Sequence, residues 1–175
     1  MLKDVPQFVP QKVCLSCDGC CRFKEHDSQF RPKLVPEEIE HVHLAQNDLT
    51  QKIFSKAMVD EKGYVRTSAC LDGCHCTFFN GNDNTCSIYK ARPFECQLYP
   101  LLLIKKGNEV AIGVHLFCPY IQEKKDSLLF EDYLERIKEF FTREEVLAFL
   151  RRNPSLAGDY DQYQAEIKYL FTIAP

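Results

Sequence analysis

The sequence lacks several features that would place it in a common class of protein. It has no excess of either charge: 22 Lys and Arg against 25 Asp and Glu give a formal charge of −3, with a pI near 6.0. Nucleic-acid-binding domains carry a clustered basic face and a high pI, so we expect no nucleic-acid partner. No apolar run approaches the ~20 residues of a membrane span. The nearest is 98–104, so no membrane association is expected.

Signals for export and for several domains are also missing. The first residues, MLKDVPQFVPQKV, contain prolines and charges but no apolar core of the roughly 7–15 residues that a signal peptide needs. We therefore expect a cytoplasmic protein. Without an internal repeat or a low-complexity tract, 175 residues suit one domain. We predict a single domain over 1–175, in which a cysteine-rich region, 14–119, shares its core with a helical part, 125–175.

What the sequence has in abundance is cysteine, with ten residues in 175. Thiols stay reduced in the cytosol, so clustered cysteines there are more often ligands or catalysts than disulfides, although an even number also fits five disulfides. The densest cluster is Cys14-Leu-Ser-Cys17-Asp-Gly-Cys20-Cys21. Two residues between cysteines allow a tight turn that points both sulfurs at one ion. Gly19 permits the backbone angles that such a turn can require.

The C-x2-C-x2-C spacing suits two kinds of metal centre. It places three thiolates on an iron–sulfur cube, whose fourth ligand is remote and is commonly followed by proline. Cys118-Pro119 fits that fourth position. Four thiolates satisfy tetrahedral zinc equally well, and the spacing alone does not separate the two metals.

Three further segments complete a larger pattern: Cys76-Thr-Phe, Cys86-Ser-Ile-Tyr89 and Arg92-Pro93-Phe-Glu-Cys96. Together with the first cluster and Cys118-Pro119, they resemble the YkgJ-like CxxCxxCC proteins, a family of zinc- or iron-chelating domains, over about residues 14–119. The cysteines that match the family pattern, and that the resemblance implies as metal ligands, are Cys14, Cys17, Cys20, Cys21, Cys76, Cys86, Cys96 and Cys118. We expect one iron–sulfur cluster, [4Fe–4S], with a second, zinc-like site as a further possibility.

Some residues stand beside this pattern or depart from it. Cys70 and Cys74 are additional cysteines, and with His75 they offer an alternative set of ligands. Gln97 occupies a position where the family often has arginine. In the outer shell of the centre, Arg92 is expected to donate hydrogen bonds to the sulfurs or to hold an anionic group, with a salt bridge to a carboxylate as the alternative. Tyr89 is expected to pack against the centre or to lie in the same outer shell, as is Tyr99.

Three functions fit these residues. The first is a metal-binding module that transfers electrons, or stores or delivers metal, for a protein partner. The second is an enzyme, because the cysteine-rich region is similar to that of flagellin lysine N-methylases; this implies S-adenosylmethionine-dependent methyl transfer to a protein substrate. The sequence, however, has no glycine-rich strand-to-helix signature for that methyl donor. The third is a structural zinc domain that presents its helical part to a protein partner.

Local signals predict an α+β fold: a small cysteine-rich metal-binding core with a short β-hairpin, surrounded by helices. Pro36-Glu37-Glu38, followed by apolar residues at helical spacing, predicts a helix over about 36–58. The apolar runs 98–105 and 109–117 flank Lys106-Gly107-Asn108 and predict a hairpin. The segment 70–96 is rich in turn-forming residues and is predicted to be an irregular loop.

The C-terminal part is predicted to be helical throughout. Apolar residues from Phe130 to Phe141 recur on one helical face. Thr142-Arg-Glu-Glu145 matches a capping box for a further helix, which Asn153-Pro154 would end. A last helix is predicted over about 159–172, with Tyr160, Tyr163 and Ile167 on one stripe.

Overall fold

The structure is a computed structural model that describes residues 2, 4–17, 19–45 and 58–175. It contains helices and small antiparallel sheets, which confirms the α+β class. The chain forms two compact units, one of residues 11–96 and the other of residues 2–10 and 97–175. The boundary between them falls at 96/97, within the region predicted to bind metal. That the two units make up the single domain expected from the sequence remains a prediction.

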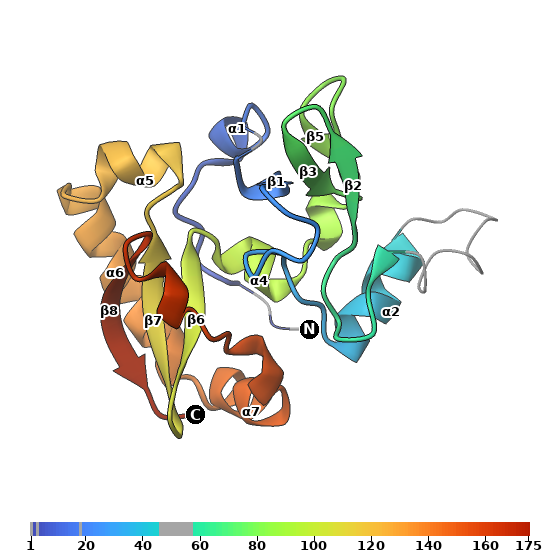
Figure 1. The fold of residues 1–175 in the computed structure, drawn as a ribbon. Helices are drawn as coiled ribbons and strands as arrows, with labels where there is room; N and C mark the ends of the chain where they lie inside the picture. The colour runs from blue at the N-terminus through green and yellow to red at the C-terminus, as the bar shows by residue number, and fades with distance from the viewer. Residues whose placement is uncertain (1, 3, 18, 46–57) are drawn as a thin grey trace. The chain divides into compact units, whose positions relative to one another are not determined.

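The first unit is built from short elements joined by tight turns (Figure 1). Antiparallel pairing gives a three-stranded sheet in the order β1-β3-β2 and a separate two-stranded sheet, β4-β5. In chain order the elements are α1 (Gln11–Cys14), η1 (Gly19–Cys21), β1 (Arg22–Phe23), α2 (Pro36–Ala45), β2 (Thr67–Cys70), β3 (Gly73–Cys76), β4 (Phe79–Asn80), β5 (Thr85–Cys86), η2 (Tyr89–Ala91) and α4 (Phe94–Leu98), which continues past residue 96.

The irregular loop predicted over 70–96 is wrong, because these residues form strands and short helices. The turn signals were real, but they connect strands of two to four residues that are too short to show a period. Gly73 begins β3 with φ +129°, and a Cβ there would lie 2.5 Å from the carbonyl oxygen of Phe23. Only glycine allows this close approach of two backbones.

Helix α2 begins as the sequence predicts. Pro36 occupies its first turn together with Glu37 and Glu38, whose charges suit the positive end of the helix dipole. The Glu38 carboxylate accepts a hydrogen bond from the backbone N–H of Val35 (3.1 Å), which closes the first turn. The predicted helix is confirmed over 36–45, and the rest of its predicted range, 46–57, lies outside the described residues.

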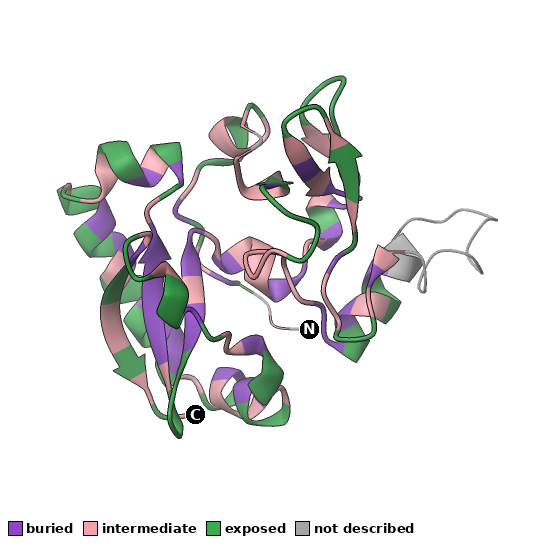
Figure 2. Ribbon diagram, in the orientation of Figure 1, coloured by how far each residue is buried: buried purple, intermediate pink, exposed green. Residues whose placement is uncertain are grey.

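The second unit is organised around the antiparallel sheet β6-β7-β8. The predicted hairpin is confirmed, since β6 and β7 pair across a turn in which Gly107 has φ +60°. Figure 2 shows that β7 is buried along most of its length. The elements are β6 (Leu101–Lys106), β7 (Glu109–His115), α5 (Pro119–Lys124), α6 (Leu128–Thr142), α7 (Glu144–Arg152), η3 (Pro154–Leu156), η4 (Asp161–Tyr163) and β8 (Ile167–Ile173).

Helices α6 and α7 follow the predicted pattern except at the turn between them. The buried face of α6 carries the apolar residues predicted from 130 to 141, and α7 ends before Pro154 as expected. The capping box is wrong: Thr142 belongs to α6, where its hydroxyl donates to the Glu139 carbonyl (2.7 Å). Arg143 is the N-cap residue of α7, and its side chain makes no capping hydrogen bond.

The last helix, predicted over 159–172, is also wrong, because residues 167–173 form strand β8. This strand pairs with β7 from His115↔Ile167 to Val110↔Ile173. Without β8, the backbone N–H and C=O groups on that edge of β7 would have no strand to pair with. The hydrogen bonds gained by pairing them stabilise the strand more than the helical spacing of the apolar residues stabilises a helix. In the part of the chain that the structure describes, no helix is both long and apolar enough to cross a membrane.

Candidate metal centre

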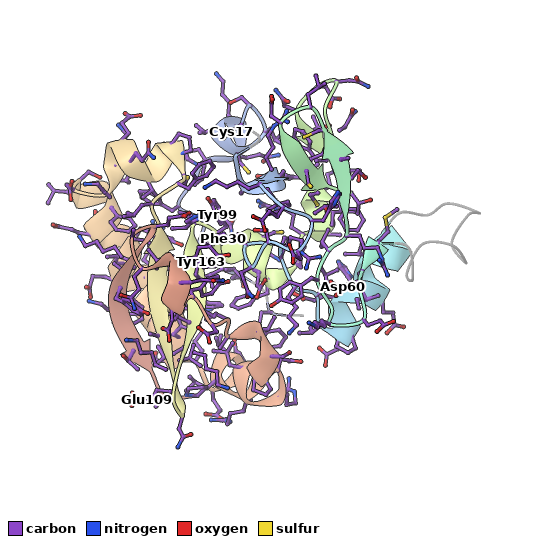
Figure 3. The ribbon with its side chains drawn as sticks, in the orientation of Figure 1. Cys17, Phe30, Asp60, Tyr99, Glu109 and Tyr163 are labelled. Carbon is purple, nitrogen blue, oxygen red and sulfur yellow. The ribbon has the colours of Figure 1, made fainter. Side chains whose placement is uncertain are left out.

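The first unit carries nine of the ten cysteines, from Cys14 to Cys96. All ten cysteines of the chain are described, and they are thiols rather than disulfides. The alternative of five disulfides is therefore not what the structure contains. Cys14 ends α1, and Cys17 follows it in the loop before η1 (Figure 3). Cys76 ends β3, and Cys86 lies in β5.

Three sulfurs of the first cluster form a hydrogen-bonded chain. The Sγ atoms of Cys20 and Cys21 lie 4.0 Å apart, and Cys14 hydrogen-bonds to Cys20. The hydrogen bond to Cys20, together with burial, raises the pKa of the Cys14 thiol. At Cys20 the bond from Cys14 favours the thiolate, but the bond to Cys21 and burial outweigh it and raise the pKa. All three are therefore held as thiols near neutral pH.

Strand register brings the first cluster to the later cysteines. Strands β1 and β3 pair Arg22 with His75. Cys21, which ends η1, and Cys76, which ends β3, adjoin this pair at the same end of the antiparallel ladder. Electrostatic interactions with Cys76, Cys96 and Cys86 contribute to the pKa shift of Cys21. The seven cysteines that such interactions connect, called the thiol cluster below, are Cys14, Cys17, Cys20, Cys21, Cys76, Cys86 and Cys96.

Burial keeps the later thiols of the cluster protonated. It raises the pKa of Cys76 to about 12, and it raises that of Cys96 well above the ordinary value, with the charges of neighbouring sulfurs adding to the effect. The pKa of Cys86 is raised by burial as well. A thiolate in this region is costly unless a cation compensates its charge.

Backbone amides nevertheless point at several of these sulfurs. Cys17 Sγ accepts a hydrogen bond from the N–H of Gly19 at 3.4 Å. Cys76 accepts from the N–H groups of residues 78 and 79, and Cys86 accepts from that of Ile88. Hydrogen bonds to the charged form favour it, so these sulfurs have donors in place for a thiolate once a metal offsets burial.

Arg92 provides the cation of the cluster. Its guanidinium lies 3.9 Å above the ring of Tyr89, and its Nε–H donates to the Tyr89 carbonyl at 3.1 Å. With this anchor, Nη1 lies 3.9 Å from Cys14 Sγ, at the outer limit for a hydrogen bond to sulfur. The contact with a sulfur is one of the roles expected for Arg92, and Tyr89 orients the guanidinium. That either residue contributes to a metal centre remains a prediction.

Cys70, Cys74 and His75 lie in the sheet β1-β3-β2, whose strand β3 also carries Cys76, but they are not members of the thiol cluster defined above. Cys74 is buried and pairs with Phe23. His75 Nδ1 lies 3.2 Å from the Cys76 carbonyl oxygen. The sulfur of Cys70, at the end of β2, accepts a hydrogen bond from Arg22 Nη1 at 3.6 Å.

The remaining candidates lie in the second unit. Cys118 is buried at the N-cap of α5, and its inclusion among the metal ligands remains a prediction. The Tyr99 hydroxyl lies 3.3 Å from Nδ1 of His115, whose Nε2 lies 3.7 Å from a carboxylate oxygen of Glu166. Gln97 accepts a hydrogen bond from Gln7 through its backbone carbonyl (2.8 Å).

Two carboxylates that the sequence did not single out for the site hold the helix that carries Cys96. Glu38, 1% exposed, accepts from the N–H of Phe94 at 2.6 Å, and Glu95 accepts from the N–H of Lys33 at 2.6 Å. Burial raises the pKa of Glu38 and raises that of Glu95 to about 8. The sequence placed Glu38 in the first turn of a helix. Its hydrogen bond with the N–H of Phe94, 56 residues further along the chain, could not be predicted from the neighbouring residues.

Whether a metal suits this site is decided by its donors. Within the described residues, no three side chains of the types Cys, His, Asp and Glu converge closely enough to hold an ion. The thiol cluster is therefore a group of neighbouring thiols that a metal must draw together as it displaces their protons. Sulfur donors select zinc, iron–sulfur clusters or copper(I) over magnesium or calcium. The amides directed at the sulfurs and the Arg92 contact also favour a thiolate centre, so the donor set fits a thiophilic metal.

The fold and the site together define a small cysteine-rich α+β protein of the metal-chelating class. A family model confirms this: residues 13–133 match the CxxCxxCC family, described as a "putative zinc- or iron-chelating domain". The chain therefore belongs to the CxxCxxCC family. Neither a curated protein nor a solved structure matches the chain.

Proposed function

We propose that this protein holds an iron–sulfur cluster, [4Fe–4S], through thiolates of its first cysteine run and at least one later cysteine. The observation that carries the proposal is the gathering of seven thiols in one unit, which is enough for the four thiolates that a [4Fe–4S] cluster takes. Three of these thiols have the C-x2-C-x2-C spacing that suits an iron–sulfur cube.

The role we propose is electron transfer or metal handling for a protein partner in the cytoplasm. The hydrogen bonds directed at the sulfurs support it, because such bonds to cluster sulfurs set the reduction potential of iron–sulfur centres. Arg92 beside Cys14 adds a positive charge at the edge of the thiol cluster. The cysteines and their neighbouring groups would bind, orient and electrostatically stabilise the centre.

Anaerobic purification followed by metal and sulfide analysis tests the proposal. We expect iron and acid-labile sulfide in about equal amounts, together with a broad visible absorption that is lost on reduction. Stoichiometric zinc without iron or sulfide would overturn the iron–sulfur assignment. The Cys70→Ser variant is the matched control, since Cys70 lies outside the thiol cluster, and it should keep the full content of iron and sulfide.

A further inference from the structure

In the second unit, a tyrosine, a histidine and a carboxylate meet at one end of the sheet β6-β7-β8. Tyr99 lies two residues before β6, His115 ends β7, and Glu166 directly precedes β8. The N–H of His115 donates to the carbonyl of Pro100 at 2.9 Å, and the N–H of Leu116 donates to the carbonyl of Glu166 at 2.8 Å. Main-chain hydrogen bonds therefore fix the starting points of all three side chains.

The side chains of these three residues are in polar contact one after another. The Tyr99 hydroxyl lies 3.3 Å from Nδ1 of His115, and Nε2 of the same ring lies 3.7 Å from a carboxylate oxygen of Glu166. With its Nε2–H directed at the carboxylate, a neutral imidazole presents the lone pair of Nδ1 to the phenol hydroxyl. The ring of Phe117 stacks on the imidazole at a centroid distance of 5.9 Å. Packing and charge thus orient His115 toward Tyr99.

We infer that Tyr99 is a nucleophile that accepts an acyl group from an activated ester, with His115 as its general base and Glu166 as the residue that orients this base. A hydroxyl in contact with a base, which a third group orients in turn, is the arrangement of an activated nucleophile. Burial lowers the pKa of His115 against the opposing effect of Glu166, and this favours the neutral imidazole that can take a proton. Tyr99 is half-buried, so it is not sealed in the core. The inference goes beyond the proposed function and is independent of it, because it uses no residue of the thiol cluster.

The transfer needs no reactant other than the ester. The phenol oxygen of Tyr99 attacks the ester carbonyl carbon and forms a C–O bond, while the hydroxyl proton passes to Nδ1 of His115. The bond from the carbonyl carbon to the leaving oxygen then breaks, and its electron pair stays on that oxygen, which takes the proton back from the imidazolium. The products are O-acyl Tyr99 and one hydroxyl compound. Between the two steps, the carboxylate of Glu166 stabilises the charged imidazolium.

The first test treats the unmodified protein with p-nitrophenyl acetate and follows O-acetylation of each tyrosine by peptide mass spectrometry, which separates it from acetylation of cysteines and lysines. Tyr120 is the matched control in the same unit. It is half-buried, its ring packs against Phe8 at 5.2 Å, and its hydroxyl makes no hydrogen bond within the described structure. General-base assistance is worth about 10²–10⁴ in rate, so Tyr99 should be acetylated at least tenfold faster than Tyr120. A smaller ratio would overturn the inference.

Variants supply the second test. His115→Gln should lower the acetylation rate of Tyr99 at least tenfold and Glu166→Gln at least threefold, and neither should change the rate of Tyr120. The Glu166 side chain is 41% exposed, so its replacement by glutamine leaves the core intact. Glu109→Gln is the control, because Glu109 begins β7 at the opposite end of the strand from His115 (Figure 3), and it should leave the Tyr99 rate unchanged.

A variant of His115 or Glu166 that keeps the full Tyr99 rate would overturn the role assigned to the residue it replaces. Should His115→Gln lose its circular dichroism, the ratio of Tyr99 to Tyr120 in the unmodified protein and the rate in Glu166→Gln still decide.

Discussion

Loading the metal-free protein with Zn2+ at pH 7 should release close to one proton for every cysteine that becomes a ligand. Burial raises the pKa of Cys76 to about 12, so only about one molecule in 100,000 has this thiol ionised at pH 7. The pKa values of Cys21, Cys86 and Cys96 are raised as well. A site made of four thiols with raised pKa values should therefore release about four protons for each ion bound.

The energetic consequence is large. Ionising Cys76 at pH 7 costs about 7 kcal/mol, at about 1.4 kcal/mol for each pH unit below its pKa. Structural zinc sites have apparent binding free energies of about 10–16 kcal/mol, so protons compete strongly with the metal. The sign is unambiguous: raised thiol pKa values weaken binding as the pH falls. The apparent affinity should change by about four powers of ten per pH unit between pH 6 and 8.

Calorimetry in buffers of different ionisation enthalpy measures the proton count directly, and a pH indicator in weakly buffered solution provides an independent value. The Cys70→Ser variant should release the same number of protons as the unmodified protein. Release of fewer than two protons per Zn2+ at pH 7 would refute the reasoning, because it would mean that the ligand sulfurs are already thiolates before the metal arrives.

Three further predictions concern single side chains. Arg92→Gln removes a charged donor from Cys14 and should lower the Zn2+ affinity by about 1 kcal/mol, or about fivefold. The control Arg22→Gln removes the equivalent contact with Cys70, a cysteine outside the thiol cluster, and should leave the Zn2+ affinity unchanged. Equal losses of affinity in the two variants, measured by chelator competition, would contradict this role of Arg92. Burial raises the pKa of Glu95 to about 8, so the folded state binds more protons than the unfolded state between about pH 5 and 8. The free energy of unfolding should therefore fall by a few kcal/mol as the pH rises through this range. Urea unfolding of Glu95→Gln in the same metal state should show a flatter pH dependence, and an unchanged slope would exclude Glu95 as its source. Tyr133 buries a hydroxyl without a hydrogen-bond partner in the described structure, so Tyr133→Phe should leave the free energy of unfolding unchanged or raise it by about 1 kcal/mol; a loss of more than 1 kcal/mol would reveal a partner for the hydroxyl.

Features that depend on neighbouring residues could be predicted from the sequence. The β6–β7 hairpin and α6 formed where their periods and turn residues indicated, because a turn or a helix face is specified within a few residues. The cysteine spacing likewise sufficed for the family, since the motif is a property of the chain itself. The first turn of α2, with its proline and two glutamates, belongs to the same class.

Tertiary structure decided what depends on partners far away in the chain. Residues 167–173 became a strand because the edge of β7 offered hydrogen bonds that a local helical period cannot anticipate. Glu38 became the acceptor for the helix of Cys96 through a contact across 56 residues. Spacing alone did not show which sulfurs would be neighbours, because strand register and the hydrophobic cluster determine how the segments around Cys21, Cys76 and Cys86 meet. The sequence therefore determined that this chain carries metal-binding thiols, and the packing of its short strands decided which of them lie together.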